Sequence, residues 1–169
     1  MTDADTRLAM RGAFTGAALF VALIVAFSTM DPNHPSSIAT LLIGVLGVSS
    51  HLVLLPVVAA LPAPGWVRAG GYAWIAIDTM LNVASINGAD AVMVAALRLG
   101  GHVPAGLWMA GAALETGGAV AALGIPLGVG LAIHAIASPW IPAWVLFIPF
   151  VSLPVWFTIV GRYFARTAR

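Results

Sequence analysis

Long apolar stretches separated by short polar turns dominate this sequence. Four of these stretches are unambiguous, and they cover residues 12–30, 37–61, 69–86 and 142–163. Each is close to the roughly 20 residues that a helix needs to cross a bilayer. Turn formers separate the first two at residues 31–36 (DPNHPS), and Pro-Ala-Pro-Gly ends the second at residues 62–65. The pattern predicts an all-α, polytopic integral membrane protein, in which residues 1–169 form a single transmembrane helical domain.

The middle of the chain permits two topologies. Residues 87–90 (NGAD) are a good turn sequence, but residues 98–104 (RLGGHVP) are poorly suited to hydrocarbon. Residues 105–138 are apolar again and contain Gly117 and Gly118. With five spans, the third helix continues past residue 90 and residues 105–138 form one long helix. With six spans, the chain turns both at residues 87–90 and near Gly117.

The distribution of arginine favours six spans. With five, Arg7 and Arg11 lie across the membrane from the three C-terminal arginines, against the tendency of positive charge to stay in the cytoplasm. With six, both termini and the loop that carries Arg68 lie on one side, together with six of the seven arginines. We therefore expect a bundle of six transmembrane helices, with five as the alternative, in a bacterial inner membrane and with both termini cytoplasmic.

Composition removes several classes of function. Hydrophobic residues make up 61% of the chain and the mean hydropathy is +1.02, which places it far from soluble domains. The chain has no Cys, which excludes thiol chemistry and iron-sulfur clusters. It also has no Lys, which excludes Schiff-base chemistry. A net charge of +1 offers no basic surface for nucleic acid.

Small residues at four-residue spacing predict close contact between helices. The pairs are Gly106 with Ala110 and Gly124 with Gly128. Such spacing lets two backbones approach within a membrane. We interpret it as tight packing inside one bundle rather than as a dimerisation motif.

Asp78 is the clearest candidate for chemistry. It lies in the middle of the third apolar stretch, where an ionisable side chain is costly and asks for a function or a partner. Trp74 and Asn82 lie four residues to either side, on the same helical face. This row of three residues on one helical face has two interpretations. It is either a ligand-binding surface that contains one carboxyl group, or a place where a protonated Asp78 hydrogen-bonds to a neighbouring helix.

Glu115 is the second intramembrane carboxylate, and it shares a helical face with Trp108. If it lay next to Asp78, burial and mutual repulsion would leave one carboxyl protonated beside an ionised one. Such a pair supplies a general acid and a general base near neutral pH. Arg98 has three interpretations, as the counter-ion of Asp90, as the counter-ion of Glu115, or as a residue that snorkels to an interface.

Two histidines lie within apolar stretches. His51 precedes Pro56, which interrupts helical hydrogen bonding and directs the imidazole into the bundle. His134 lies in the fifth stretch. Two imidazoles on different helices are the minimum for haem ligation, although buried histidines that hydrogen-bond to a neighbouring helix are the commoner outcome. No spacing of His and Glu singles out a metal site.

These residues support three hypotheses. In the first, Asp78, Glu115 and His51 are catalytic, while Trp74, Asn82, Trp108, His134 and Trp144 bind a lipophilic, isoprenoid- or sterol-like molecule. Such an isomerase or cyclase needs no cofactor, because protons do the chemistry. In the second, the carboxylates carry protons in a small-molecule transporter, which at 169 residues would work as a homodimer. In the third, the protein is a non-catalytic subunit that binds haem or pigment.

Overall fold

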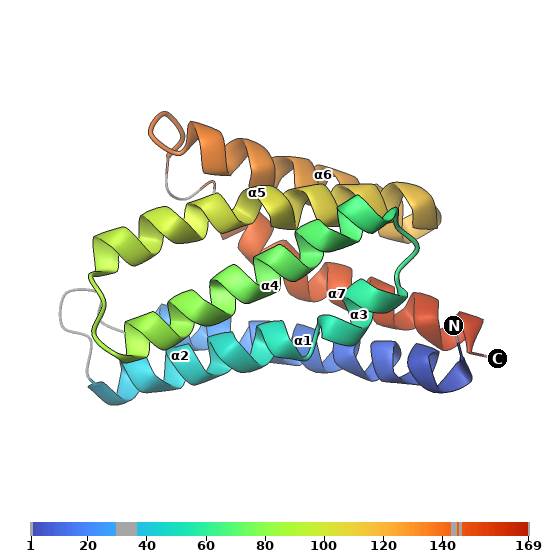
Figure 1. The fold of residues 1–169 in the computed structure, drawn as a ribbon, viewed down its shortest axis with the longest axis horizontal. Helices are drawn as coiled ribbons and strands as arrows, with labels where there is room; N and C mark the ends of the chain where they lie inside the picture. The colour runs from blue at the N-terminus through green and yellow to red at the C-terminus, as the bar shows by residue number, and fades with distance from the viewer. Residues whose placement is uncertain (1, 30–36, 143–144, 146, 169) are drawn as a thin grey trace.

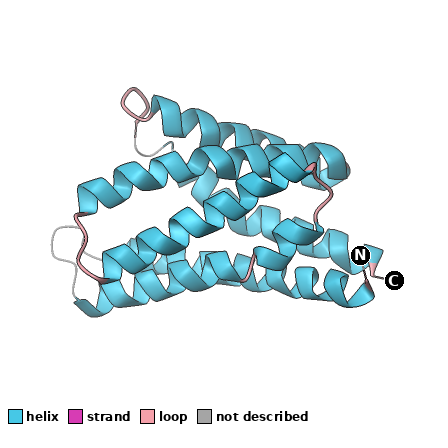
Figure 2. Ribbon diagram, viewed as in Figure 1, coloured by secondary structure: helices cyan, strands magenta, loops and turns pink. Residues whose placement is uncertain are grey.

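The computed structural model describes residues 2–29, 37–142, 145 and 147–168, and its secondary structure there is helical (Figure 2). In chain order the helices are α1 (Asp3–Thr29), α2 (Ser37–Leu52), α3 (Leu55–Ala60), α4 (Gly65–Ile86), α5 (Ala91–Thr116), α6 (Gly118–Ala137) and α7 (Phe147–Thr167) (Figure 1). Five segments are long and apolar enough to cross a membrane: α1, α2 with α3, α5, α6 and α7. The all-α membrane bundle expected from the sequence is confirmed.

Two tight turns decide between the five-span and six-span topologies. Gly117 and Gly118 have φ angles of 74° and 55°, and their backbone reverses the chain between α5 and α6. Glycine adopts such angles without steric cost. Asp90 caps the start of α5, because its carboxylate accepts a hydrogen bond from the backbone N–H of Met93 at 2.8 Å. The long apolar stretch therefore belongs to two helices, and the chain makes both turns of the six-helix version, with five of its helices long and apolar enough to cross a membrane.

Helices α2 and α3 form one interrupted span. Pro56 has no N–H to donate, and it occupies the first turn of α3, where that loss is tolerated. The chain tightens just before it, since the N–H of Leu54 donates to the carbonyl of His51 at 3.0 Å. The interruption predicted from Pro56 is thus present, and it begins after Leu52, the residue that follows His51.

The helices close into a ring. Helix α1 packs against α2, α3 and α7, α4 lies between α2 and α5, and α6 lies between α5 and α7. Both termini, the α3–α4 connection and the α5–α6 turn lie at one end of the bundle, which we call the terminal end (Figure 1). The α4–α5 turn lies at the opposite end (Figure 1). Helix α4 thus runs the length of the bundle beside the apolar spans, although it carries Arg68 and Asp78.

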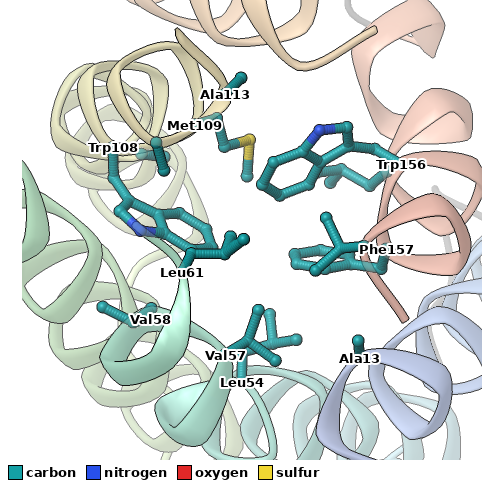
Figure 3. Close-up of a cluster of buried hydrophobic side chains, with 14 of the residues drawn as sticks. Ala13, Leu54, Val57, Val58, Leu61, Trp108, Met109, Ala113, Trp156 and Phe157 are labelled. Carbon is teal, nitrogen blue, oxygen red and sulfur yellow. The ribbon is translucent and has the colours of Figure 1, made fainter. Parts of the chain in front are cut away.

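The half of the bundle nearer the termini is densely packed. Side chains from several helices meet there, as Figure 3 shows for Leu54, Val57, Val58 and Leu61 beside Trp108, Met109, Trp156 and Phe157. All eight are fully buried. The indole N–H of Trp156 donates to the carbonyl of Val120 at 3.1 Å and so joins α7 to α6.

Six aromatic rings form a closed circuit across the bundle. Successive ring centroids are 5.0–5.8 Å apart in the order Phe20, His51, Trp74, Trp108, Trp156, Phe157 and back to Phe20. These spacings are typical of stabilising aromatic contacts. The circuit connects α1, α2, α4, α5 and α7 through side chains alone, and it includes an ionisable histidine.

Close backbone approach between α5 and α6 generates a stability prediction. A Cβ on Gly106 would collide with the carbonyl oxygen of Gly128, so Gly106→Ala should lower the free energy of unfolding by about 2 kcal/mol. Gly100 on the same helix has open space around its Cα, and Gly100→Ala should raise stability by about 0.5 kcal/mol. Unfolding in mixed micelles measures both values. Equal effects of the two substitutions would contradict close packing at Gly106.

The topology predicts the side of the membrane on which each turn lies. Because the chain has no native Cys, single cysteines report accessibility without background. Gly65→Cys and Ala119→Cys should react with an impermeant maleimide from one face of sealed vesicles, and Asn87→Cys from the other. Labelling of Asn87→Cys from the same face as Gly65→Cys would exclude the six-span arrangement.

Candidate functional site

Helices α2, α4 and α5 each contribute one face to a polar cluster. Helix α4 supplies Asp78 and Asn82, which lie one turn apart, and α5 supplies Arg98 and His102, which also lie one turn apart. Helix α2 supplies His51 near the end where it is interrupted. All five side chains line the same cavity.

Asp78 is the centre of this cluster. Its Oδ1 lies 3.3 Å from Nε of Arg98, and its Oδ2 lies 3.4 Å from Nε2 of His51. Asp78 is 3% exposed, whereas the Arg98 side chain is 29% exposed and reaches outward from the pair. A buried carboxylate without a counter-charge is unstable in an apolar interior, so Arg98 balances it from α5, and His51 on α2 adds to this when its ring is protonated.

Asn82 completes the cluster and positions Arg98. Its amide Nδ2 donates to the backbone carbonyl of Asp78 at 2.8 Å, and its Oδ1 accepts from Nη2 of Arg98 at 3.0 Å. Gly47 on α2 makes room for this amide, because a Cβ there would lie 2.5 Å from the Asn82 side chain. The small residue on α2 therefore permits the polar contact between α4 and α5.

The hydrogen bonds of His51 determine where its protons lie. Its Nδ1 is 2.7 Å from the carbonyl oxygen of Gly47. A carbonyl only accepts, so Nδ1 carries a proton and donates it. In a neutral ring Nε2 would then be unprotonated and would point a lone pair at the carboxylate of Asp78. The contact between Nε2 of His51 and Oδ2 of Asp78 is attractive when one further proton lies between these two atoms. The His51–Asp78 pair can therefore bind one proton.

The cavity beside this pair has one polar and one apolar wall. Its volume is about 230 Å³, and its polar residues come from α2, α4 and α5. The opposite wall belongs mainly to α1, α6 and α7 and consists of Phe20, Leu23, Phe27, Leu131, Phe150 and Leu153. Nδ1 of His102 is buried and has no hydrogen-bond partner among the described residues.

A second hollow leads from the cluster toward the end opposite the termini. It measures about 530 Å³ and shares Asn82, Arg98 and His102 with the first cavity. Its outer part is lined by Ala89 and Ala91, next to the α4–α5 turn. The polar cluster thus has a hollow on one side and the packed aromatic core on the other.

Several residues expected at one site lie in different places. Trp74 lines the cavity. Trp108 stacks on Trp74, with 5.8 Å between the two ring centroids, and is fully buried in the core. Glu115 is exposed near the end of α5, about 25 Å of helix beyond Arg98. Asp78 and Glu115 therefore do not form a pair. Trp144 lies outside the described residues.

The two intramembrane histidines also separate. His51 lines the central cavity, whereas His134 lines another cleft between α6 and α7. The two histidines predicted as a possible ligand pair therefore line different cavities. Nor do any three described His, Asp or Glu side chains gather closely enough to hold a metal ion.

Arg98 is the residue of the polar cluster whose partner the sequence did not predict. It pairs with Asp78, and none of its three earlier interpretations included that contact. A usable signal was present, because Asp78 lies ten residues before Gly88 and Arg98 ten residues after it. In an antiparallel helical hairpin that turns at Gly88, such residues lie at the same depth. Pairing across the hairpin follows from that symmetry.

No protein-family model matches the chain, and no curated protein or solved structure is significantly similar to it. The site is therefore interpreted from its own geometry.

The buried pair generates a prediction with a matched control. Asp78→Asn leaves Arg98 and His51 without their counter-charge and should lower the free energy of unfolding by about 3 kcal/mol. Glu115→Gln makes the same chemical change at an exposed position and should alter it by less than about 0.5 kcal/mol. Unfolding in mixed micelles measures both.

A double-mutant cycle then isolates the ion pair. Asp78→Asn combined with Arg98→Gln should cost clearly less than the sum of the two single substitutions, because neither charge is left alone. Strict additivity would mean that the contact between these two side chains contributes nothing.

Proposed function

We propose that this protein binds a lipophilic small molecule in the central cavity and exchanges a proton with it through the His51–Asp78 pair. The observation that carries the proposal is the two-walled cavity with a proton-holding pair on its polar wall. The apolar wall suits a hydrocarbon body, and the polar wall suits a single reactive or hydrogen-bonding group. Sites for small molecules commonly combine such walls.

An isomerisation or cyclisation of an isoprenoid- or sterol-like molecule fits this arrangement. The pair gives its proton to one carbon of an alkene, the electron pair of that alkene forms the new C–H bond, and the base recovers a proton from a neighbouring carbon. One proton is added to the substrate and one is removed from it, so the reaction is balanced and needs no cofactor. Aromatic faces stabilise positive charge that develops between these events, and Phe20 and Trp74 line the cavity.

In this mechanism Arg98 and Asn82 are positioning residues. Arg98 holds Oδ1 of Asp78 and leaves Oδ2 to His51, and Asn82 holds the guanidinium. Glu115 has no part in the proposal, because it lies at the other end of α5. The acid and the base are the two members of one hydrogen-bonded pair.

A proton-coupled carrier is the second candidate, and a specific observation favours it. The two hollows that share the polar cluster extend from it toward the end opposite the termini, and on its other side the cluster adjoins the buried aromatic core. A cavity open toward one side, with a proton site at its base, is what one state of an alternating-access carrier requires.

We also propose that the terminal end faces the cytoplasm of a bacterial inner membrane. Arg7, Arg11 and Arg68 lie in helices at that end, together with Arg162 and Arg166. Positive charge is retained preferentially on the cytoplasmic side.

Mass spectrometry of the purified protein tests binding. The wild type, isolated in mild detergent, should retain a lipophilic molecule that Asp78→Asn and His51→Leu lose by at least about tenfold, as removal of a charged hydrogen bond implies. Glu115→Gln is the control and should retain it fully. Equal retention by all four proteins would place the ligand elsewhere.

Isotope exchange separates catalysis from transport. Incubation with the retained molecule in D₂O should place deuterium on carbon in the wild type and not in His51→Leu. Retention without deuterium on carbon rules out the isomerase or cyclase mechanism. Uptake of the same molecule into vesicles that contain the protein, driven by an imposed pH gradient, supports the carrier. Deuterium incorporation without such uptake supports the enzyme.

A further inference from the structure

A second cleft lies between α6 and α7, outside the site described above. We call it the α6–α7 cleft, and its volume is about 340 Å³. Its lining residues are Leu123, Pro126, Leu127, Gly130, Ile133, His134, Ile141, Val145, Ile148, Pro149 and Ser152. None of them carries a formal charge apart from a histidine if protonated, and nine have no side-chain hydrogen-bonding group.

His134 is the feature that distinguishes this cleft from an ordinary gap between helices. The residue is 3% exposed, yet its Nδ1 has no hydrogen-bond partner among the described residues. His51 satisfies the equivalent atom with the carbonyl four residues earlier. A buried polar atom without a partner is costly, so the imidazole of His134 is the group in the described lining that has an unmet hydrogen bond.

The second polar group in the cleft is already satisfied as a donor. The hydroxyl of Ser152 donates to the carbonyl of Ile148 at 2.7 Å, which leaves its oxygen free to accept. None of the described lining residues is acidic, and none carries a permanent positive charge, so they offer no counter-charge to a charged head group. A molecule that suits this lining is neutral and has one oxygen for His134.

The position of the cleft defines how such a molecule enters and lies. Ile133 and Ile148 are both more than half exposed on the apolar outer surface, so the cleft opens toward the lipid. His134 lies one turn from the end of α6, and Leu123 lies about 16 Å deeper along the same helix. A head group would lie near the membrane interface, with an extended apolar body between the helices.

We propose that the α6–α7 cleft binds a neutral membrane lipid whose head group is a single hydroxyl or carbonyl, with His134 as its hydrogen-bond partner. The site is separate from the His51–Asp78 cavity, and binding there does not depend on proton exchange at Asp78. Its ligand enters sideways from the bilayer, whereas the central cavity is reached through the hollow beside the α4–α5 turn.

Photolabelling with three probes of one chain length tests the proposal. The probes are diazirine-bearing hexadecanol, hexadecane and hexadecanoic acid, offered to the protein in phosphatidylcholine nanodiscs. Hexadecanol should label peptides from α6 and α7 at the cleft about fivefold more than hexadecane, which is the preference expected for one net hydrogen bond. Equal labelling by the two, or strongest labelling by the acid, would overturn the proposal.

Variants assign that preference to the cleft. His134→Leu should remove the preference for hexadecanol, and His134→Gln, which retains a hydrogen-bonding amide, should restore part of it. Gly130 has open space up to Pro149, so Gly130→Leu should fill the cleft and reduce labelling by all probes. Val129→Leu changes a neighbouring lipid-facing residue outside the lining and should leave labelling unchanged.

Asp78→Asn separates the two sites. It should leave hexadecanol labelling of the α6–α7 cleft at the wild-type level even where it abolishes ligand retention in the central cavity. Loss of cleft labelling in Asp78→Asn would show that the cleft is not an independent site. Persistence of the preference in His134→Leu would show that His134 is only a packing residue.

Discussion

The charge on Asp78 is the constraint around which the bundle is organised. A carboxylate buried among apolar helices needs a counter-charge, and this one has Arg98 on α5 and His51 on α2 within 3.4 Å. Because its two oxygens face different helices, the side chain joins three spans at one depth. The polar wall of the cavity is a consequence, since Asn82 and His102 lie one turn from these same residues.

The interior of the bundle is apolar in one half and polar in the other. Toward the termini, indole, phenyl and branched aliphatic side chains fill the space between the helices (Figure 3). Toward the α4–α5 turn, the interior holds the polar cluster and the two hollows that share its residues. The aromatic circuit lies at the boundary, and His51 belongs both to it and to the ion cluster. A change in the protonation of His51 would therefore be felt directly by the rings of Phe20 and Trp74.

Small residues and prolines determine which helices meet and which stay apart. Gly106 and Gly128 bring α5 and α6 into backbone contact, as the four-residue spacing predicted. Prolines have the opposite effect, since Pro126 of α6 and Pro149 of α7 both line the cleft between those helices. The interruption before Pro56 likewise lies beside His51, where a straight helix would continue its hydrogen-bond ladder. The polar histidines thus occur where helices are interrupted or separated.

The sequence by itself determined the membrane class, the six-helix topology and the stripe of Trp74, Asp78 and Asn82. These features depend on local properties, namely hydropathy, glycine turns and the helical repeat, so neighbouring residues in the chain are sufficient to predict them. Only the tertiary structure decided that Asp78 pairs with Arg98 and His51, that Glu115 lies far away on the surface, and that His134 faces a cleft of its own. Those outcomes depend on the relative depth and rotation of neighbouring helices, which packing between spans sets and which no single span encodes.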